Sequence, residues 1–337
     1  MRQWLLPLVR AETPCLALLQ ERLRCPPLDS YFAFTANLGT HTFFMVMLPM
    51  LFWCGHGDLG RAYVSSDPPF IRPADACRSS VHILALGVYC SGFVKDLLCL
   101  PRPLSPPLQR ITMSGSAALE YGFPSTHSTN AVSVAVYAMH VLRLREHALH
   151  PAVYLVLQAL LYLYAGSIVL GRLYCGMHGF FDVVIGSMLG ALLSVLQLKY
   201  GDAFDSWITN GTYVRPLVAT LVVLALVRIH PEPADDCPCY DDSVAFAGVV
   251  IGIEAGSWHY ASTPYASVSS MPPVTNPLEP GSIEWFSAST RIILGVLIIF
   301  AWRGTTKPIL LRSLPPIFRL VEHLGLLLPR KFFLGAS

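Results

Sequence analysis

The sequence runs repeatedly through apolar stretches, several of which reach the roughly 20 residues that a helix needs to cross a bilayer. Of the 337 residues, 53% are hydrophobic and 13% are charged, whereas about a quarter is charged in an average soluble domain. These features predict an all-α, polytopic transmembrane helical bundle of about eight spans. We place the spans near residues 31–54, 80–100, 126–143, 151–170, 179–198, 215–229, 243–260 and 286–302.

The spans divide the chain into three parts, with the transmembrane domain at residues 31–305. Residues 1–30 lack the long apolar core and cleavage site of a signal peptide, so we expect them to form an N-terminal extramembrane segment. Residues 306–337 mix arginines with apolar residues and contain Pro315 and Pro316. We expect the helix to break there and this C-terminal segment to be interfacial or partly inserted.

The charges and cysteines argue against nucleic-acid binding and against a metal site. The formal net charge is +2, and the lysines and arginines are scattered, so no nucleic-acid partner is indicated. Most of the nine cysteines lie in or beside apolar stretches, where a thiol behaves as a small hydrophobe. Cys237 and Cys239 share a polar loop, but a single residue between two cysteines is weak evidence for a metal site. We therefore predict no metal and no cofactor.

The first polar cluster lies at the end of the second predicted span and contains Lys95 and Arg102. The two cations are seven residues apart, almost two helical turns, so they can project on one face and grip one anion. Pro101 and Pro103 bracket the arginine and restrict the local backbone. The alternative is that both side chains simply snorkel to the membrane surface.

The second cluster, Ser125, Thr126 and His127, opens the third predicted span after Pro124. This pattern signals a helix start, where free backbone N–H groups and hydroxyls favour phosphate binding. His127 in the first turn has the right ordinary pKa to act as an acid or base near neutrality. The alternative is an ordinary helix cap with a histidine at the interface.

The third cluster, Arg172, His178 and Asp182, joins the fourth and fifth predicted spans. His178 and Asp182 are four residues apart, so on a helix the carboxylate can reach one imidazole nitrogen and orient the ring. The other nitrogen is then free to act as a nucleophile or base, and Arg172 adds a third cation for phosphate. The alternative is a structural Asp–His pair between helices. In an eight-span count the three clusters fall on one side of the membrane and can converge.

At these residues the sequence resembles the type 2 phosphatidic acid phosphatase superfamily, whose signature reads KxxxxxxRP, then PSGH, then SRxxxxxHxxxD. The matching segments are residues 95–103, 124–127 and 171–182, and the first and third spacings match fully. Thr126 stands where many members have glycine, as in a known subgroup, and Gly171 stands where most have serine. The second departure removes one hydroxyl that would otherwise face the phosphate.

Within the superfamily, the sequence is most similar to fungal sphingoid long-chain base 1-phosphate phosphatases, relatives of sphingosine 1-phosphate phosphatase. The segments that carry this likeness are LGTHTFF at 38–44, CLPRP at 99–103, YGFPSTHS at 121–128, YCGMHGFFDV at 174–183 and HPEPADDCPCYDDSVAF at 230–246. The resemblance implies a hydrolase that converts a sphingoid base 1-phosphate, presented in the membrane, to the free base and phosphate.

The resemblance also assigns roles to individual residues. It implies that His178 attacks phosphorus and becomes a phosphohistidine, that Asp182 supports it and that His127 protonates the leaving alkoxide. Side chains that would hold the phosphoryl oxygens are Lys95, Arg102, Ser125, Thr126 and Arg172. Three cations and a helix N-terminus can balance a phosphate dianion without a metal.

Three alternatives remain open at this point. The chain can be a broader phosphatase acting on phosphatidate or isoprenoid diphosphate, a lipid phosphotransferase, or a non-catalytic lipid-binding or transport protein. The resemblance implies the endoplasmic reticulum membrane with the site facing the lumen, and we favour this orientation. The positive-inside tendency opposes it, because the N-terminal arginines and the tail from Arg303 to Lys331 fall on the active side.

Overall fold

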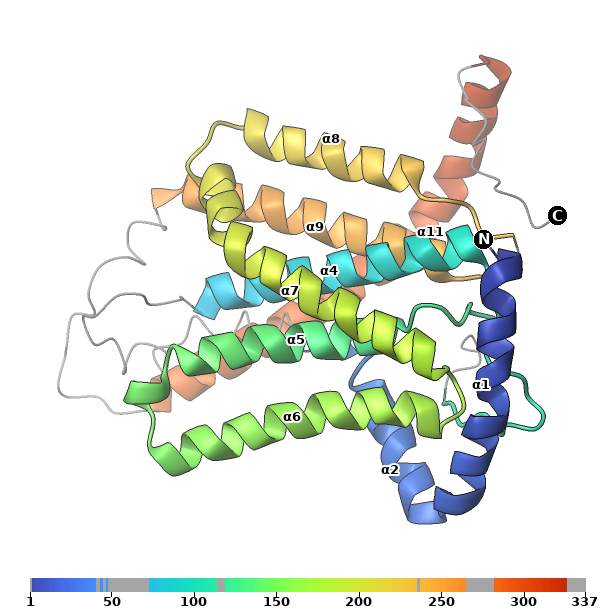
Figure 1. Ribbon diagram of the computed structural model, residues 1–337. Helices are drawn as coiled ribbons and strands as arrows, with labels where there is room; N and C mark the ends of the chain where they lie inside the picture. Colours follow the sequence, from blue (N-terminus) through green and yellow to red (C-terminus); the bar gives the residue numbers. More distant parts are fainter. Residues whose placement is uncertain are drawn as a thin grey trace.

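The computed structural model describes residues 2–40, 43–44, 47, 73–113, 119–234, 237–264 and 282–325, and every regular element within them is a helix. The predicted all-α, polytopic bundle is confirmed (Figure 1). The helices are α1 (Arg2–Leu23), α2 (Pro26–Asn37), α4 (Pro73–Leu98), α5 (Thr126–Arg143), the 3₁₀ turn η3 (Glu146–Ala148), α6 (Pro151–Tyr174), α7 (Phe180–Thr209), α8 (Val214–Ile229), α9 (Cys239–Ala261) and α11 (Ser282–His323).

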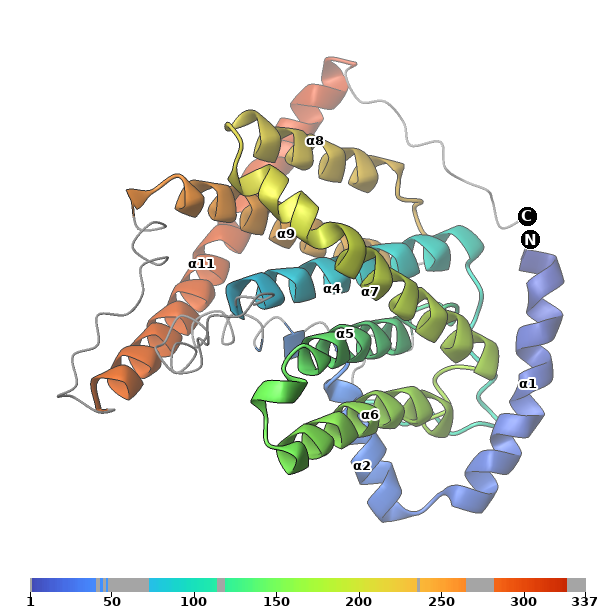
Figure 2. The ribbon, with the colours of Figure 1, turned by 60° about the vertical axis from the view of Figure 1, so that its left-hand side comes forward.

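Helices α4, α5, α7 and α9 form the centre of the bundle, with α6 beside α5 and α8 beside α9 (Figures 1 and 2). The closest packing is between α5 and α7, where two glycines of α7 lie against the α5 backbone. A Cβ atom added to Gly190 would lie 2.2 Å from the Thr129 carbonyl oxygen, and one added to Gly186 would lie 2.6 Å from that of Ser125. Small residues allow this approach, as is common between membrane helices.

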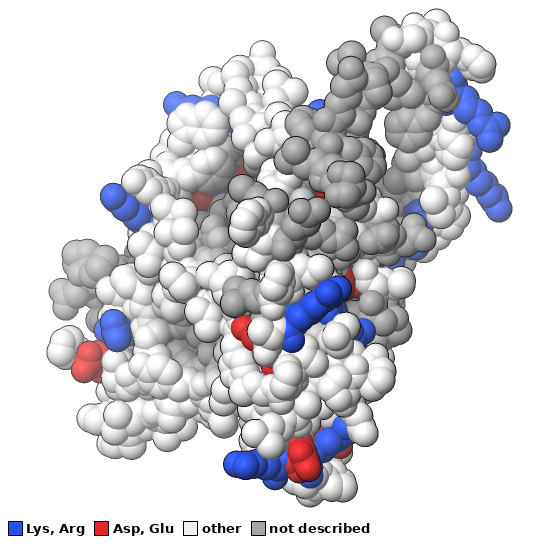
Figure 3. All heavy atoms as spheres, turned by 45° about the vertical axis from the view of Figure 1, so that its right-hand side comes forward, with Lys and Arg blue, Asp and Glu red and all other residues white. Residues whose placement is uncertain are grey.

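Among the described residues, four helical segments are long and apolar enough to cross a membrane: Arg78–Leu98, Pro151–Tyr174, Phe180–Thr209 and Ser289–Val321. The predicted spans near 126–143, 215–229 and 243–260 coincide with α5, α8 and α9, which are shorter or carry more polar residues. The predicted span 31–54 begins within α2, and most of its second half lies outside the described residues. The total of eight spans therefore stays a prediction. Figure 3 shows a mostly uncharged surface on which Lys, Arg, Asp and Glu side chains lie in separate small groups.

The C-terminal helix differs from the sequence-based expectation. Helix α11 continues from Ser282 to His323 through Pro308, Pro315 and Pro316, so the expected break is wrong. Each proline removes one backbone hydrogen bond and crowds the carbonyl four residues earlier. Membrane helices tolerate such prolines where other groups satisfy the freed backbone atoms. The division of the chain at residue 305 consequently does not coincide with a helix end.

A buried ionic cluster joins α4, α7 and α9. It lies toward the helix ends opposite to those that carry the predicted motifs. Glu254 of α9 accepts hydrogen bonds from Arg78 and pairs with His82, each at 2.5 Å. Arg78 also lies 3.3 Å from an oxygen of Asp205 in α7. Because buried charges are tolerated only when paired, this cluster fixes how the three helices pack.

We expect Glu254→Ala to destabilise the protein, because it leaves Arg78 and His82 of α4 buried without their main acceptor. Breaking a buried pair typically costs about 3–5 kcal/mol. The measurement is the thermal unfolding midpoint of the detergent-solubilised protein. Glu146→Ala, which removes an exposed carboxylate from η3, is the matched control. A Glu254→Ala variant as stable as this control would show that the cluster does not hold the helices together.

Candidate active site

The structure brings the three polar clusters of the sequence to one end of the bundle. Lys95 lies in the last turn of α4, His127 in the first turn of α5, and Arg172 in the last turn of α6. His178 lies in the connection that leads into α7. These helix ends meet beside α1, which crosses the end of the bundle (Figure 1).

Helix α1 holds the connection between α6 and α7 in place. A carboxylate oxygen of Glu12 accepts a hydrogen bond from the backbone N–H of Phe181 at 3.0 Å. Gln20 donates from its side-chain amide to the carbonyl oxygens of Tyr174 and Gln109, at 2.8 Å and 3.0 Å. The N-terminal segment is thus part of the framework around the site.

Lys95 and Arg102 both bind Glu120, a residue that sequence reasoning missed. The Lys95 Nζ atom lies 3.2 Å from Glu120 Oε2, and an Arg102 Nη2 donates to the same oxygen at 3.1 Å. Arg102 Nε also donates to the Glu120 carbonyl oxygen at 3.0 Å. The spacing of the two cations predicted that they grip one anion, and in this structure the anion is a carboxylate. A lone glutamate in a polar loop carries no sequence signal that would have identified it.

The imidazole of His178 is fully buried and held in one orientation. Nδ1 donates to the carbonyl oxygen of Gly122 at 2.8 Å, and Nε2 lies 3.0 Å from Nη1 of Arg102. Because a guanidinium has only donors, Nε2 must be the unprotonated acceptor. Burial, and then Arg102 and Arg172, lower the pKa of His178 well below its ordinary value. His178 is therefore a neutral imidazole with its lone pair on Nε2.

Asp182 does not share a helical face with His178 as the spacing predicted, because α7 begins only at Phe180. The chain turns at Gly176, which has a positive φ of 63°, and enters the helix through Gly179. An oxygen of Asp182 lies 3.6 Å from His178 Nδ1, beyond hydrogen-bond distance, and accepts from the Gly179 N–H at 2.8 Å. Asp182 thus caps α7 and places a carboxylate beside the ring, while the Gly122 carbonyl takes the hydrogen bond.

The residues at the start of α5 have different surroundings: one caps the helix, and the next two line a cavity. Ser125 is fully buried and is the N-cap of α5, where its Oγ atom accepts from the Ser128 N–H at 3.3 Å. Its oxygen also accepts from the Ser128 hydroxyl at 3.0 Å, so the lone pairs serve the cap while its own O–H remains a donor. Thr126 is hydrogen-bonded to Ser91 of α4 at 2.9 Å, and both Thr126 and His127 line a cavity at the helix start.

This cavity has a volume of about 100 Å³, against the roughly 10–15 Å³ that one water needs, so it has room for a small hydrated anion. Its polar lining includes Lys95, Glu120, Thr126, His127, Asn130 and Arg172. The buried Nε atom of Arg172 has no hydrogen-bond partner within the described ranges. His178 does not line the cavity, since the Arg102 guanidinium lies against its Nε2 atom. The lining is chemically suited to an anion.

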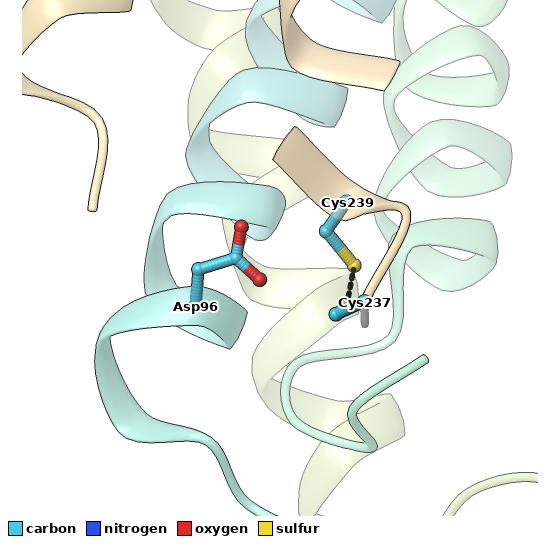
Figure 4. Close-up of side chains that lie close together, drawn as sticks. All are labelled: Asp96, Cys237 and Cys239. Atoms are coloured by element: carbon cyan, nitrogen blue, oxygen red, sulfur yellow. Dashed lines mark hydrogen bonds between the residues drawn. The ribbon is translucent and has the colours of Figure 1, made fainter. Parts of the chain in front are cut away.

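Asp96, Cys237 and Cys239 form the one cluster of potential metal ligands in the described part of the chain (Figure 4). Their ligand atoms lie within 4.8 Å of one another, but the two sulfurs are 2.9 Å apart and share a hydrogen bond. Two sulfurs bound to a tetrahedral zinc at about 2.3 Å would be roughly 3.7 Å apart. The hydrogen bond with Cys239 lowers the pKa of Cys237 to about 6. The observed spacing fits a thiol pair that shares a proton better than a zinc site.

Comparison with known proteins places this site in a family. A sequence model of the PAP2 superfamily matches residues 78–204, the stretch that runs from α4 to α7. A dihydrosphingosine 1-phosphate phosphatase of Schizosaccharomyces pombe is 40% identical over 95% of this chain and 72% of its own length. No solved structure matches the chain.

Two further relatives extend the comparison. The dihydrosphingosine 1-phosphate phosphatase YSR3 of Saccharomyces cerevisiae is 34% identical over 76% of this chain, and lipid phosphate phosphatase delta of Arabidopsis thaliana is 33% identical over 68%. The aligned regions span 59% and 51% of the lengths of these two relatives. From the family match and the 40% identity to the first relative, we conclude that the chain belongs to the PAP2 superfamily.

Proposed function

We propose that this protein hydrolyses sphingoid long-chain base 1-phosphates to the free base and phosphate. The observation that carries the proposal is His178, a neutral imidazole whose Nε2 lone pair lies at 3.0 Å from Arg102. Lys95 and Arg172 line the adjoining cavity, and Arg102 is joined to that cavity through Glu120, which also lines it. The names of the two fungal relatives supply the substrate class.

In the first step the phosphate dianion binds Lys95, Arg102 and Arg172, and the Arg102 guanidinium turns from His178 toward the phosphoryl oxygens. The Nε2 lone pair of His178 forms a bond to phosphorus while the bond from phosphorus to the lipid oxygen breaks. His127 gives its proton to that oxygen, so the lipid leaves as an alcohol. The product on the enzyme is a phosphohistidine.

In the second step a water oxygen attacks phosphorus, His127 takes a proton from the water, and the bond between phosphorus and Nε2 breaks. His178 carries a positive charge while it is phosphorylated. The Gly122 carbonyl at 2.8 Å and the Asp182 carboxylate at 3.6 Å lie beside Nδ1 and stabilise that charge. Ser125 caps α5, and with Thr126 it presents the start of this helix, which favours anions, to the phosphate.

The membrane location follows from the apolar helices, and we assign the protein to the endoplasmic reticulum with its site facing the lumen. Helix α1 marks the active-site end through the Glu12 contact to Phe181, whereas Asn210 of the sequon Asn210-Gly-Thr212 follows the opposite end of α7. A lumenal site thus places Asn210 on the cytosolic side.

The broader alternative is a lipid phosphatase that also accepts phosphatidate or isoprenoid diphosphates. The Arabidopsis relative is named simply as a lipid phosphate phosphatase. The same metal-free cation set would bind any of these head groups. An assay of all three lipid classes under identical conditions separates the two proposals, because the narrower one requires a clear preference for the sphingoid phosphate.

We expect His178→Gln to lower phosphate release from dihydrosphingosine 1-phosphate by about 10⁴-fold or more, because the nucleophile is lost. Excess chelator should leave the wild-type rate unchanged. Brief reaction with ³²P-labelled lipid should give an acid-labile protein phosphate in the wild type and none in the variant. His147→Gln, at an exposed histidine of η3, is the matched control. Retained turnover in His178→Gln would exclude His178 as the nucleophile.

Replacement of His127 by Gln should reduce hydrolysis of the lipid phosphate by about 10²–10⁴-fold, the usual contribution of a general acid or base. The loss should be much smaller in the burst of p-nitrophenol released from p-nitrophenyl phosphate, because that leaving group departs without a proton. The comparison of the two leaving groups is the measurement. An equal loss on both would mean that His127 does not protonate the leaving oxygen.

Sidedness can be read from Cys15, an exposed thiol on α1 at the active-site end. In sealed microsomes a membrane-impermeant maleimide should label Cys15 only after the membrane is permeabilised, if the site faces the lumen. The Cys15→Ser variant identifies the signal that belongs to this residue. Labelling of Cys15 in intact microsomes would place the site in the cytosol instead.

A further inference from the structure

Glu120 occupies the place where the proposed mechanism requires the substrate phosphate. One carboxylate oxygen, Oε2, lies 3.2 Å from Lys95 Nζ and 3.1 Å from Arg102 Nη2. Both cationic side chains are almost completely buried, with 2% of their area exposed, whereas that of Glu120 is 21% exposed and lines the cavity. Glu120 is thus the member of the trio that an entering ligand can reach and displace.

Glu120 is ionised in the empty site. Burial alone would raise its pKa, but the charges of Lys95 and Arg102 outweigh burial and hold the pKa below its ordinary value. A phosphate dianion that takes Lys95 and Arg102 therefore releases a carboxylate beside a second negative group. A partly buried carboxylate that loses its partners is strongly unfavourable unless it finds another cation.

A sphingoid base 1-phosphate can supply that cation itself. Its carbon 2, next to the carbon that bears the phosphate, carries a primary amine that is protonated at neutral pH. The positive and negative groups of the lipid are therefore only a few bonds apart. This separation fits a site in which Lys95 and Arg102 lie in direct contact with Glu120. When the lipid enters, Lys95 and Arg102 exchange Glu120 for the phosphate of the lipid. Glu120 exchanges the two cations for the ammonium group of the same lipid.

We infer that Glu120 is the binding site for the ammonium group of the substrate and selects lipids with a free amine next to the phosphate. The inference rests on the proposed function, because it assigns a second group of that substrate to the same site. A phosphate lipid without a free amine, such as an N-acylated sphingoid phosphate or phosphatidate, leaves Glu120 without a cation and binds more weakly.

The test compares dihydrosphingosine 1-phosphate with its N-acetyl derivative, which differs only in the charge of the nitrogen and the small acyl group. Phosphate release from both is measured in mixed micelles for the wild type and for Glu120→Gln. We expect the ratio of the two kcat/KM values to favour the free amine in the wild type and to fall by about tenfold or more in the variant. Glu146→Gln, at an exposed position of η3, should keep the wild-type ratio.

Inhibition by inorganic phosphate gives a second readout that a misfolded variant cannot imitate. In the wild type the phosphate must displace Glu120 and has no ammonium to offer in return. We therefore expect the inhibition constant to decrease by about tenfold in Glu120→Gln, since the cations are no longer occupied by a carboxylate. Tighter inhibition together with a lost preference for the amine would support the inference.

An unchanged substrate ratio in an active Glu120→Gln variant would overturn the inference. Asp242 is a second carboxylate that lines the cavity. If Asp242→Asn lost the preference for the free amine and Glu120→Gln kept it, the inference would also be overturned. Failure of the proposed function looks different: the wild type would then release phosphate from phosphatidate or an isoprenoid diphosphate but from neither sphingoid lipid.

Discussion

The guanidinium of Arg102 is the interaction on which the arrangement of the catalytic end depends. It donates to the backbone and side chain of Glu120, to the Met177 carbonyl oxygen at 2.8 Å, and to Nε2 of His178. A buried arginine is stable only when its donors are matched by acceptors, and here these acceptors come from two separate segments of the chain. The loop before α5 and the connection before α7 are therefore ordered together.

The same constraint explains why His178, the proposed nucleophile, has a defined tautomer. With a donor on one side of the imidazole and the Gly122 carbonyl on the other, the proton of His178 can reside only on Nδ1. Burial among cations keeps the ring uncharged. In the proposed mechanism the ring gains a positive charge when it attacks phosphorus, and the Asp182 carboxylate at 3.6 Å would then stabilise it. In this mechanism the neighbouring cations disfavour a charged His178 imidazole until the negative phosphoryl group binds to them.

The sequence predicted the helical class and which polar residues gather, because both follow from short-range patterns. Lys95 and Arg102 do meet at one anionic group, and His178 lies 3.6 Å from Asp182. Neither pair shares a helical face, because α4 ends at Leu98 and α7 begins at Phe180. The sequence could not foresee that the Gly122 carbonyl orients the histidine, since this contact depends on how distant segments meet. The role of Glu120 could not be predicted from the sequence for the same reason. The prolines of α11 signalled a break, but the helix continues through them.

The contact between α5 and α7 has a consequence for chemistry. Gly186 and Gly190 place the backbone of α7 directly against Ser125 and Thr129, so no side chain lies between the two helices there. His127 belongs to the first helix and His178 directly precedes the second, which means that their separation is set by main-chain contact rather than by deformable side chains. If the two histidines act as proposed, contact between the two backbones holds the proton donor and the nucleophile at a fixed separation before the substrate binds.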